Sequence, residues 1–125
     1  MQGLPGPQGL AGATGPCSDI DSYSPSNSED FHAALIGGRV YGGRASAPGG
    51  IPTWQDFSVI SGYPTGVPCG VSITAQGPNA YIKVLTVARR IYQLRVSVNG
   101  QNFSPDLVQG WIELTPGPTP ATLRE

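Results

Sequence analysis

The chain has 125 residues, and its seven Lys plus Arg nearly balance its eight Asp plus Glu. This charge pattern argues against a nucleic-acid-binding protein, which would carry a basic stripe, and no apolar run approaches the length that spans a bilayer. The length suffices for a short N-terminal arm and one domain with a modest core.

A strict three-residue glycine period opens the chain. Its five triplets begin at Gly3, Gly6, Gly9, Gly12 and Gly15. Only glycine fits at the crowded axis of a collagen triple helix, whereas a flexible Gly/Pro-rich tether, the alternative, needs no such period. We therefore expect residues 1–18 to form a collagen-like stalk and the protein to be a homotrimer. Five triplets extend about 45 Å and would hardly hold three chains unaided, so the head must trimerise as well.

The next segment, residues 19–30, is rich in serine and acidic side chains, and we expect a polar acidic linker here. Asp19, Asp21, Glu29 and Asp30 offer oxygen ligands, but their spacing lacks the glycine and terminal glutamate of a calcium-binding EF-hand loop. The sequence predicts no metal site.

The following stretch allows two interpretations. Asn27 or Ser28 can cap a short helix through Leu35, whereas residues 36–41 resemble a strand interrupted by glycine. The glycine pairs downstream do not form a phosphate-cradling pattern and are expected in turns and bulges: Gly37-Gly38, Gly42-Gly43 and Gly49-Gly50.

Further along, period-two alternation predicts strands. A short run at 57–60 precedes a clearer one at 71–75, and the runs at 81–87 and 91–98 are expected to pair as a hairpin across residues 88–90. Arg89 and Arg90 would lie in that polar turn.

Near the end of the chain, Asn99-Gly100 suggests a tight turn into a brief strand at 101–103, and a strand is predicted at 111–114 with Trp111 buried. Residues 117–125 form a proline-rich tail. Many short strands with Gly/Pro turns indicate an all-β fold, a small β-sandwich or jelly-roll-like head over residues 31–116 that trimerises.

Two cysteines offer a disulfide. Cys17 ends the last triplet, and Cys69 lies in a turn-rich stretch before a predicted strand. Three copies of Cys17 cannot all pair with one another, so a symmetric interchain bond would join Cys17 to Cys69 of a neighbour. An intrachain bond, a bond to another protein and two free thiols remain alternatives.

Candidates for chemistry are few. His32 is the only histidine and has no Ser/His/Asp or Cys/His motif around it, so we expect neither an enzyme nor a cofactor. Trp54 and Tyr63 lie in proline-flanked loops and are the residues we nominate for ligand contact, because exposed aromatic rings stack on sugars.

The repeat Gly-Leu-Pro-Gly-Pro-Gln-Gly-Leu-Ala, joined to a compact β head, resembles the collagen-like fibre proteins of tailed bacteriophages. The resemblance covers residues 3–17 specifically and the rest in architecture alone. A similar arrangement occurs in the complement C1q and tumour-necrosis-factor-like group, but this head and stalk are shorter and no secretion signal is recognisable. Because no secretion signal is recognisable, we expect the protein to be a virion component that is assembled in the host cytoplasm and released by lysis.

The resemblance implies a structural virion protein, a trimeric fibre or decoration appendage on capsid, neck, collar or tail. Its partners would be two further copies of itself and other virion proteins, with no nucleic acid and no membrane. The alternative is a tip that binds a receptor or a host surface glycan.

Overall fold

The structure is a computed structural model that describes residues 17–98 and 102–114; the Gly-X-Y triplets up to Pro16 and the proline-rich tail lie outside them. Within this part the fold is all-β, with no α-helix. One antiparallel sheet holds β2 (Asp19–Ser26), β3 (Glu29–Ile36), β4 (Arg39–Ala45) and β5 (Thr53–Asp56). The other holds β6 (Pro68–Gln76), β7 (Asn79–Thr86) and β8 (Ile91–Ser97), with β9 (Ser104–Pro105) and β10 (Ile112–Leu114) both paired to β8.

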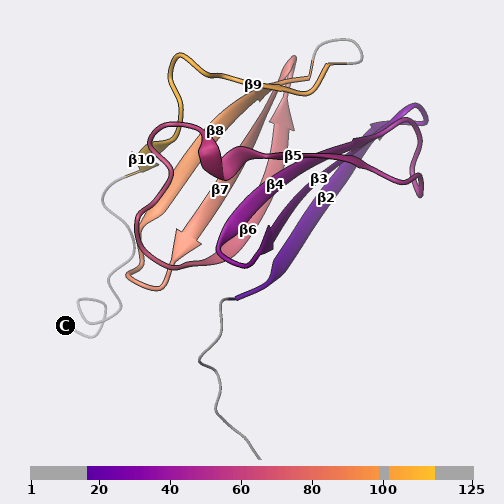
Figure 1. The fold of residues 1–125 in the computed structure, drawn as a ribbon. Helices are drawn as coiled ribbons and strands as arrows, with labels where there is room; N and C mark the ends of the chain where they lie inside the picture. The colour runs from indigo at the N-terminus through magenta and orange to yellow at the C-terminus, as the bar shows by residue number, and fades with distance from the viewer. Residues whose placement is uncertain (1–16, 99–101, 115–125) are drawn as a thin grey trace, which may run out of the picture.

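Strands β2 to β5 pair consecutively in the first sheet and β6 to β8 in the second, so each sheet is built on a meander, and β9 and β10 both pair with β8 (Figure 1). Gly37 and Gly38 form the two-residue turn between β3 and β4, with φ of 61° and 81°. Positive φ at both positions is the requirement of a type I′ hairpin turn, which glycine meets without strain. This order differs from the crossovers of a jelly roll and defines a sandwich of two meanders.

The core lies between the facing sheets. Alternate residues of β3 and β7 point inward because side chains of a strand alternate between its two faces. The fully buried side chains include Phe31, Leu35 and Val40 from the first sheet and Ile82, Val84, Leu94 and Val96 from the second. Trp111 is buried as predicted.

The N-terminal part of the head differs from expectation. The acidic segment 19–30 is not a linker, since it forms β2 and the start of β3. The helix proposed from Asn27 or Ser28 to Leu35 is wrong as well. This segment is strand β3, because Phe31, Ala33 and Leu35 all face the core with period two.

The later strands agree better with the sequence. The predicted strand at 71–75 lies within β6, and the hairpin across residues 88–90 is confirmed as β7 and β8. The run at 57–60 is not a strand: Asp56 caps a short 3-10 helix η2 (Phe57–Val59), and the strand β5 precedes it. The brief strand expected at 101–103 is found at β9 instead, and the proposed Asn99-Gly100 turn lies outside the described residues.

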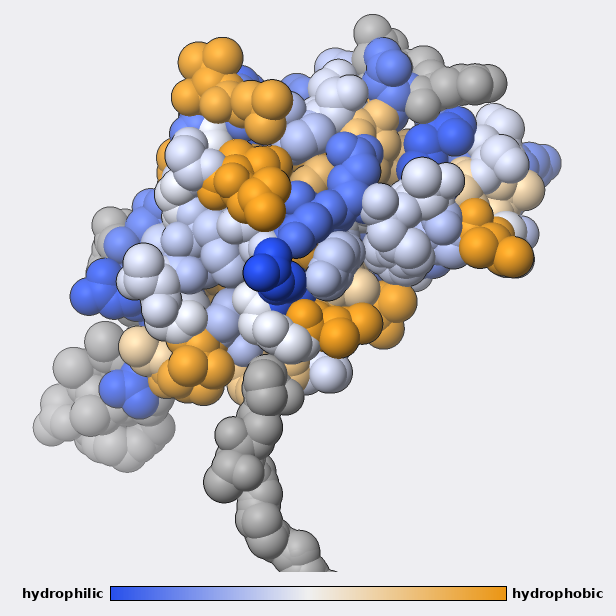
Figure 2. Space-filling view, viewed as in Figure 1, coloured by the Kyte–Doolittle hydropathy of each residue, from blue (hydrophilic) through white to orange (hydrophobic). Residues whose placement is uncertain are grey.

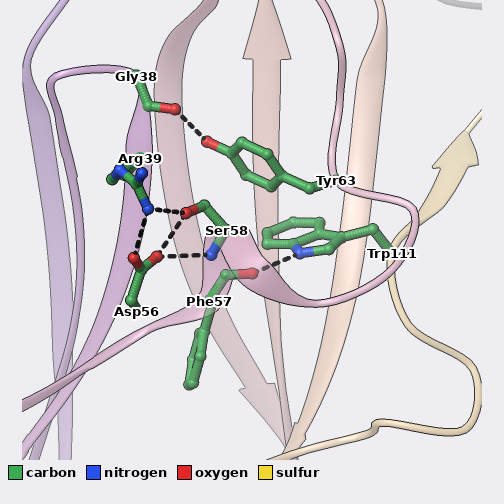
Figure 3. Close-up of polar contacts among 7 residues, drawn as sticks. All are labelled: Gly38, Arg39, Asp56, Phe57, Ser58, Tyr63 and Trp111. Carbon is green, nitrogen blue, oxygen red and sulfur yellow. Dashed lines mark hydrogen bonds and ion pairs between the residues drawn. The ribbon is translucent and has the colours of Figure 1, made fainter.

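A polar brace closes one side of the sandwich (Figure 3). The indole N–H of Trp111 donates to the carbonyl of Phe57 at 3.0 Å. The Tyr63 hydroxyl donates to the Gly38 carbonyl at 2.8 Å, and its ring meets Trp111 edge-on. These contacts tie the residue before β10 to the helix η2, and the loop after η2 to the turn between β3 and β4.

Candidate functional site at the N-terminal junction

The opposite side of the sandwich is closed where the edge strands β2 and β6 meet. A disulfide joins Cys17 to Cys69, with Cα atoms 4.8 Å apart and a separation of 52 residues. The register of β6 against β7 shifts between Pro68 and Gly70, so Cys69 lies in a β-bulge. Bulges re-aim side chains, and this one accompanies the bond to Cys17.

Two carboxylates continue the same alignment. Asp19 accepts a hydrogen bond from the backbone N–H of Val71 at 2.9 Å, and Asp21 accepts one from Ile73 at 3.0 Å. Both pairs are again separated by 52 residues, so β2 and β6 run side by side in one direction and a single register. We call this set the N-terminal junction, comprising Cys17, Asp19 and Asp21 with Cys69, Val71 and Ile73.

The junction satisfies backbone groups that would otherwise be open. An edge strand exposes unpaired N–H groups that invite association with other chains. Here carboxylate oxygens accept two of those N–H groups on β6, and hydrogen bonds to charged groups contribute about 1.5–3 kcal/mol each. The chain that leaves the last triplet is thereby joined to β6 twice, through the Cys17 disulfide and through the Asp19 carboxylate.

These contacts bear on two points that the sequence raised. The disulfide joins Cys17 and Cys69 of one chain, which is the intrachain alternative among those left open. Asp19 and Asp21, expected to be solvated, point toward β6 because they share the core-facing side of β2 with positions opposite Leu35 and Ala33. Acidic residues are tolerated on this side of β2 because each carboxylate accepts a backbone N–H group of β6, 52 residues away.

The nominated residue Trp54 lies elsewhere, on the outer face of the first sheet. Its register partner is Gly43, which in turn pairs with His32. A Cβ built on Gly43 would lie 2.7 Å from the Trp54 ring, so the indole rests directly on the glycine backbone. Its side chain is nevertheless 43% exposed, and the His32 ring lies 5.9 Å from it. We call Trp54, Gly43 and His32 the Trp54 platform.

A buried carboxylate orients the histidine of this platform. Asp30 Oδ2 lies 3.0 Å from His32 Nε2, and Ser24 donates to Asp30 Oδ1 at 2.6 Å. The hydrogen bond from Ser24 lowers the pKa of Asp30 most strongly, and His32 lowers it further against the opposing effect of burial. The ionised Asp30 therefore accepts the Nε2–H of His32 and holds the ring beside Trp54.

The second nominated residue, Tyr63, serves the fold. Its hydroxyl donates a hydrogen bond to the Gly38 carbonyl, and its ring packs against Trp111 (Figure 3). Burial first, and then the charge of Asp56, raises the pKa of Tyr63 to about 12. Tyr63 and Trp54 are not brought together into one site.

A further polar cluster is centred on Asp56. Asp56 accepts from Arg39 at 2.8 Å and from the backbone N–H of Ser58 at 2.9 Å, without a histidine in the network (Figure 3). Among residues 17–98 and 102–114, no three His, Cys, Asp or Glu side chains gather as metal ligands. In the same part of the chain, no helix has the length and apolar character to cross a membrane.

Comparison with known proteins adds no identity. No protein family, no curated protein and no solved structure matches this chain.

Proposed function

We propose that this chain is a structural virion protein of a tailed bacteriophage, a homotrimeric fibre or decoration appendage on capsid, neck, collar or tail. The observation that carries the proposal is the junction between repeat and head. The Gly-X-Y period ends at Cys17, the residue that the disulfide fixes to the base of the head. A collagen-like arm tied covalently to a compact head suits an appendage that withstands force outside the cell.

The disulfide also supports a role outside the host cytoplasm. Thiols stay reduced in most cytosols, and disulfides persist in oxidising surroundings. In this proposal the chains assemble in the host cytoplasm, and the Cys17–Cys69 bond forms after lysis releases the virion. Its partners are two further copies and neighbouring virion proteins, and it performs no catalysis.

Light-scattering mass of the purified full chain tests the trimer. The expected mass is that of three chains. In a second test, Gly9→Ala should abolish the triple-helical circular dichroism while the head remains trimeric. A single-chain mass would sink the proposal and turn the repeat into a tether. On particles of the parent phage, antibodies against the head should label the surface, and unlabelled particles would remove the virion assignment.

A second function is favoured by one observation, the exposed Trp54 ring on its glycine floor. Such a ring, with the His32 imidazole beside it, is the stacking surface that a sugar uses. The head would then be a receptor- or glycan-binding tip. Glycan-array binding that disappears in Trp54→Ala but persists in Val108→Ala, a change at an exposed residue outside the platform, would establish this function; an array without binding would exclude it.

A further inference from the structure

Two apolar hollows flank the N-terminal junction on the outer surface of the head. The first, patch A, lies over β2 and β3 and consists of Ile20, Ala34 and Ile36. The second, patch B, lies over β6, β7 and β8 and consists of Gly70, Leu85 and Ile91, with Ser72 and Lys83 also lining the hollow. Large side chains in both patches are open to solvent: Ile20 is 62% exposed, Ile36 59% and Leu85 43%.

Both patches adjoin the entry point of the chain. Asp19 lines each of the two hollows, and it follows Cys17, the end of the glycine period, by two residues. Figure 2 shows apolar side chains on both sides of this end of the head. Copies joined through their triplets would therefore bring these surfaces closest together.

The apolar character is confined to this end of the second sheet. Farther along the same outer face, beyond Lys83, which borders both hollows, the surface is lined by Thr74, Tyr81 and Gln93, which are polar or amphipathic. The solvent-facing side of an antiparallel sheet commonly carries polar side chains. The apolar part of this face is the part that adjoins Asp19, next to the end of the repeat.

Threefold symmetry requires two different contact surfaces on each copy. A ring of identical chains closes through heterologous contacts, in which one surface of each copy meets another surface of the next. We infer that patch A of one chain packs against patch B of its neighbour, three times around the axis of the repeat. This inference rests on the homotrimer proposed above and names the surface that holds its heads together.

Charge placed in either patch tests the contact. In the full chain, Ile20→Asp and Leu85→Asp are each expected to reduce the light-scattering mass from three chains to one, with the β-sheet circular dichroism unchanged. Val108→Asp is the matched control, because Val108 is 99% exposed and belongs to neither patch, and it should keep the mass of three chains. If Ile20→Asp fails to fold, Ile36→Asp at the end of β3 takes its place.

Mixing the two variants tests the pairing itself. Ile20→Asp keeps an intact patch B and Leu85→Asp an intact patch A, so an equimolar mixture should form a two-chain species that neither variant forms alone. No such species in the mixture would overturn the pairing of A with B.

The outcomes separate this inference from the proposed function. A three-chain mass for the unmodified protein, retained by the folded Asp variants, would overturn the patch contact and leave the trimer standing. A single-chain mass for the unmodified protein would overturn both.

Discussion

The carboxylate of Asp19 lies 2.9 Å from the backbone nitrogen of Val71, where a carbonyl oxygen would stand if β2 and β6 shared a regular parallel ladder. A side chain thus replaces the backbone as the acceptor. The two sheets remain separate, yet their edges are joined in register. Because Cys17 precedes Asp19 by two residues and Cys69 precedes Val71 by two, the same register brings the two sulfurs together.

The second carboxylate of the junction gives a direct stability prediction. Asp21→Ala leaves the N–H of Ile73 without its acceptor, and an unpaired, partly buried donor costs about 1–3 kcal/mol. Asp21→Asn keeps a side-chain oxygen and should lose less. Urea unfolding followed by circular dichroism measures both free energies.

The control for this pair is Glu113→Gln. Glu113 forms an exposed ion pair with Arg90, and such pairs contribute about 0–1 kcal/mol. An unfolding midpoint for Asp21→Ala as high as that of Glu113→Gln would show that the Asp21 contact has no energetic role.

The disulfide closes a long loop in the unfolded chain. With its 52-residue separation, the chain-entropy relation gives about 4 kcal/mol of stabilisation. The double variant Cys17→Ser with Cys69→Ser should be less stable by roughly this amount. Reductant should lower the urea midpoint of the unmodified protein and leave that of the double variant unchanged; equal midpoints for the two proteins without reductant would contradict the prediction.

Adjacent glycines in β4 face opposite sides of the first sheet and should respond differently. A Cβ on Gly42 would lie 2.8 Å from the Phe103 ring and closer still to Phe57, both in the core. Gly42→Ala should therefore destabilise the head by about 1–3 kcal/mol, as overpacking does.

Gly43→Ala is the matched variant, because its methyl group meets the half-exposed Trp54 ring, which can swing outward. We expect a smaller loss of stability and stronger quenching of tryptophan fluorescence by acrylamide, since Trp111 stays buried. Equal destabilisation by the two variants would show that Trp54 is held as rigidly as the core.

Stability should fall in acid because of Asp30 and Asp56. At Asp56 burial raises the pKa, but hydrogen bonds from Ser58 and the contact with Arg39 outweigh it, so the net pKa is lowered. Asp30 has a lowered pKa through Ser24 and His32. Unfolded aspartate titrates at about 3.9, so the unfolded chain takes up protons first as the pH falls.

The stabilisation by these groups is thus complete above about pH 5, where unfolded aspartate is ionised, and is lost as the pH drops through the lower folded-state pKa values. Urea unfolding between pH 7 and pH 2 should show this loss, and Asp56→Asn should reduce its steepness. A pH dependence that Asp56→Asn leaves unaltered would assign the acid sensitivity to other groups.

Local patterns predicted some elements well. The runs at 81–87 and 91–98 were recognisable because a half-exposed antiparallel hairpin alternates apolar and polar residues. The run at 57–60 misled because its apolar residues imitate a strand, whereas the Asp56 cap and the contact of Phe57 with the core turn it into a 3-10 helix. The glycine pairs were expected in turns and bulges, which is correct for Gly37-Gly38 and wrong for Gly42-Gly43, since the latter lies inside β4.

The candidate surfaces were less predictable. The proline-flanked position of Trp54 indicates an exposed ring. The residues that it packs beside, Gly43 and His32, lie on other strands and could not be predicted from that position. The sequence predicts a solvated linker around Asp19 and Asp21 because the stretch is acidic and rich in serine, whereas the structure places both carboxylates against β6. Their partners are backbone N–H groups, which leave no mark in the sequence.

By itself, the sequence determined the all-β class, the β7–β8 hairpin and the extent of the glycine period, because each follows from spacing between near neighbours. Only the tertiary structure decided the partner of Cys17, the acceptors on β6 and the two apolar patches beside Asp19. These depend on how two sheets meet edge to edge. A constant offset of 52 residues between strands of different sheets arises from packing, and no local propensity encodes it.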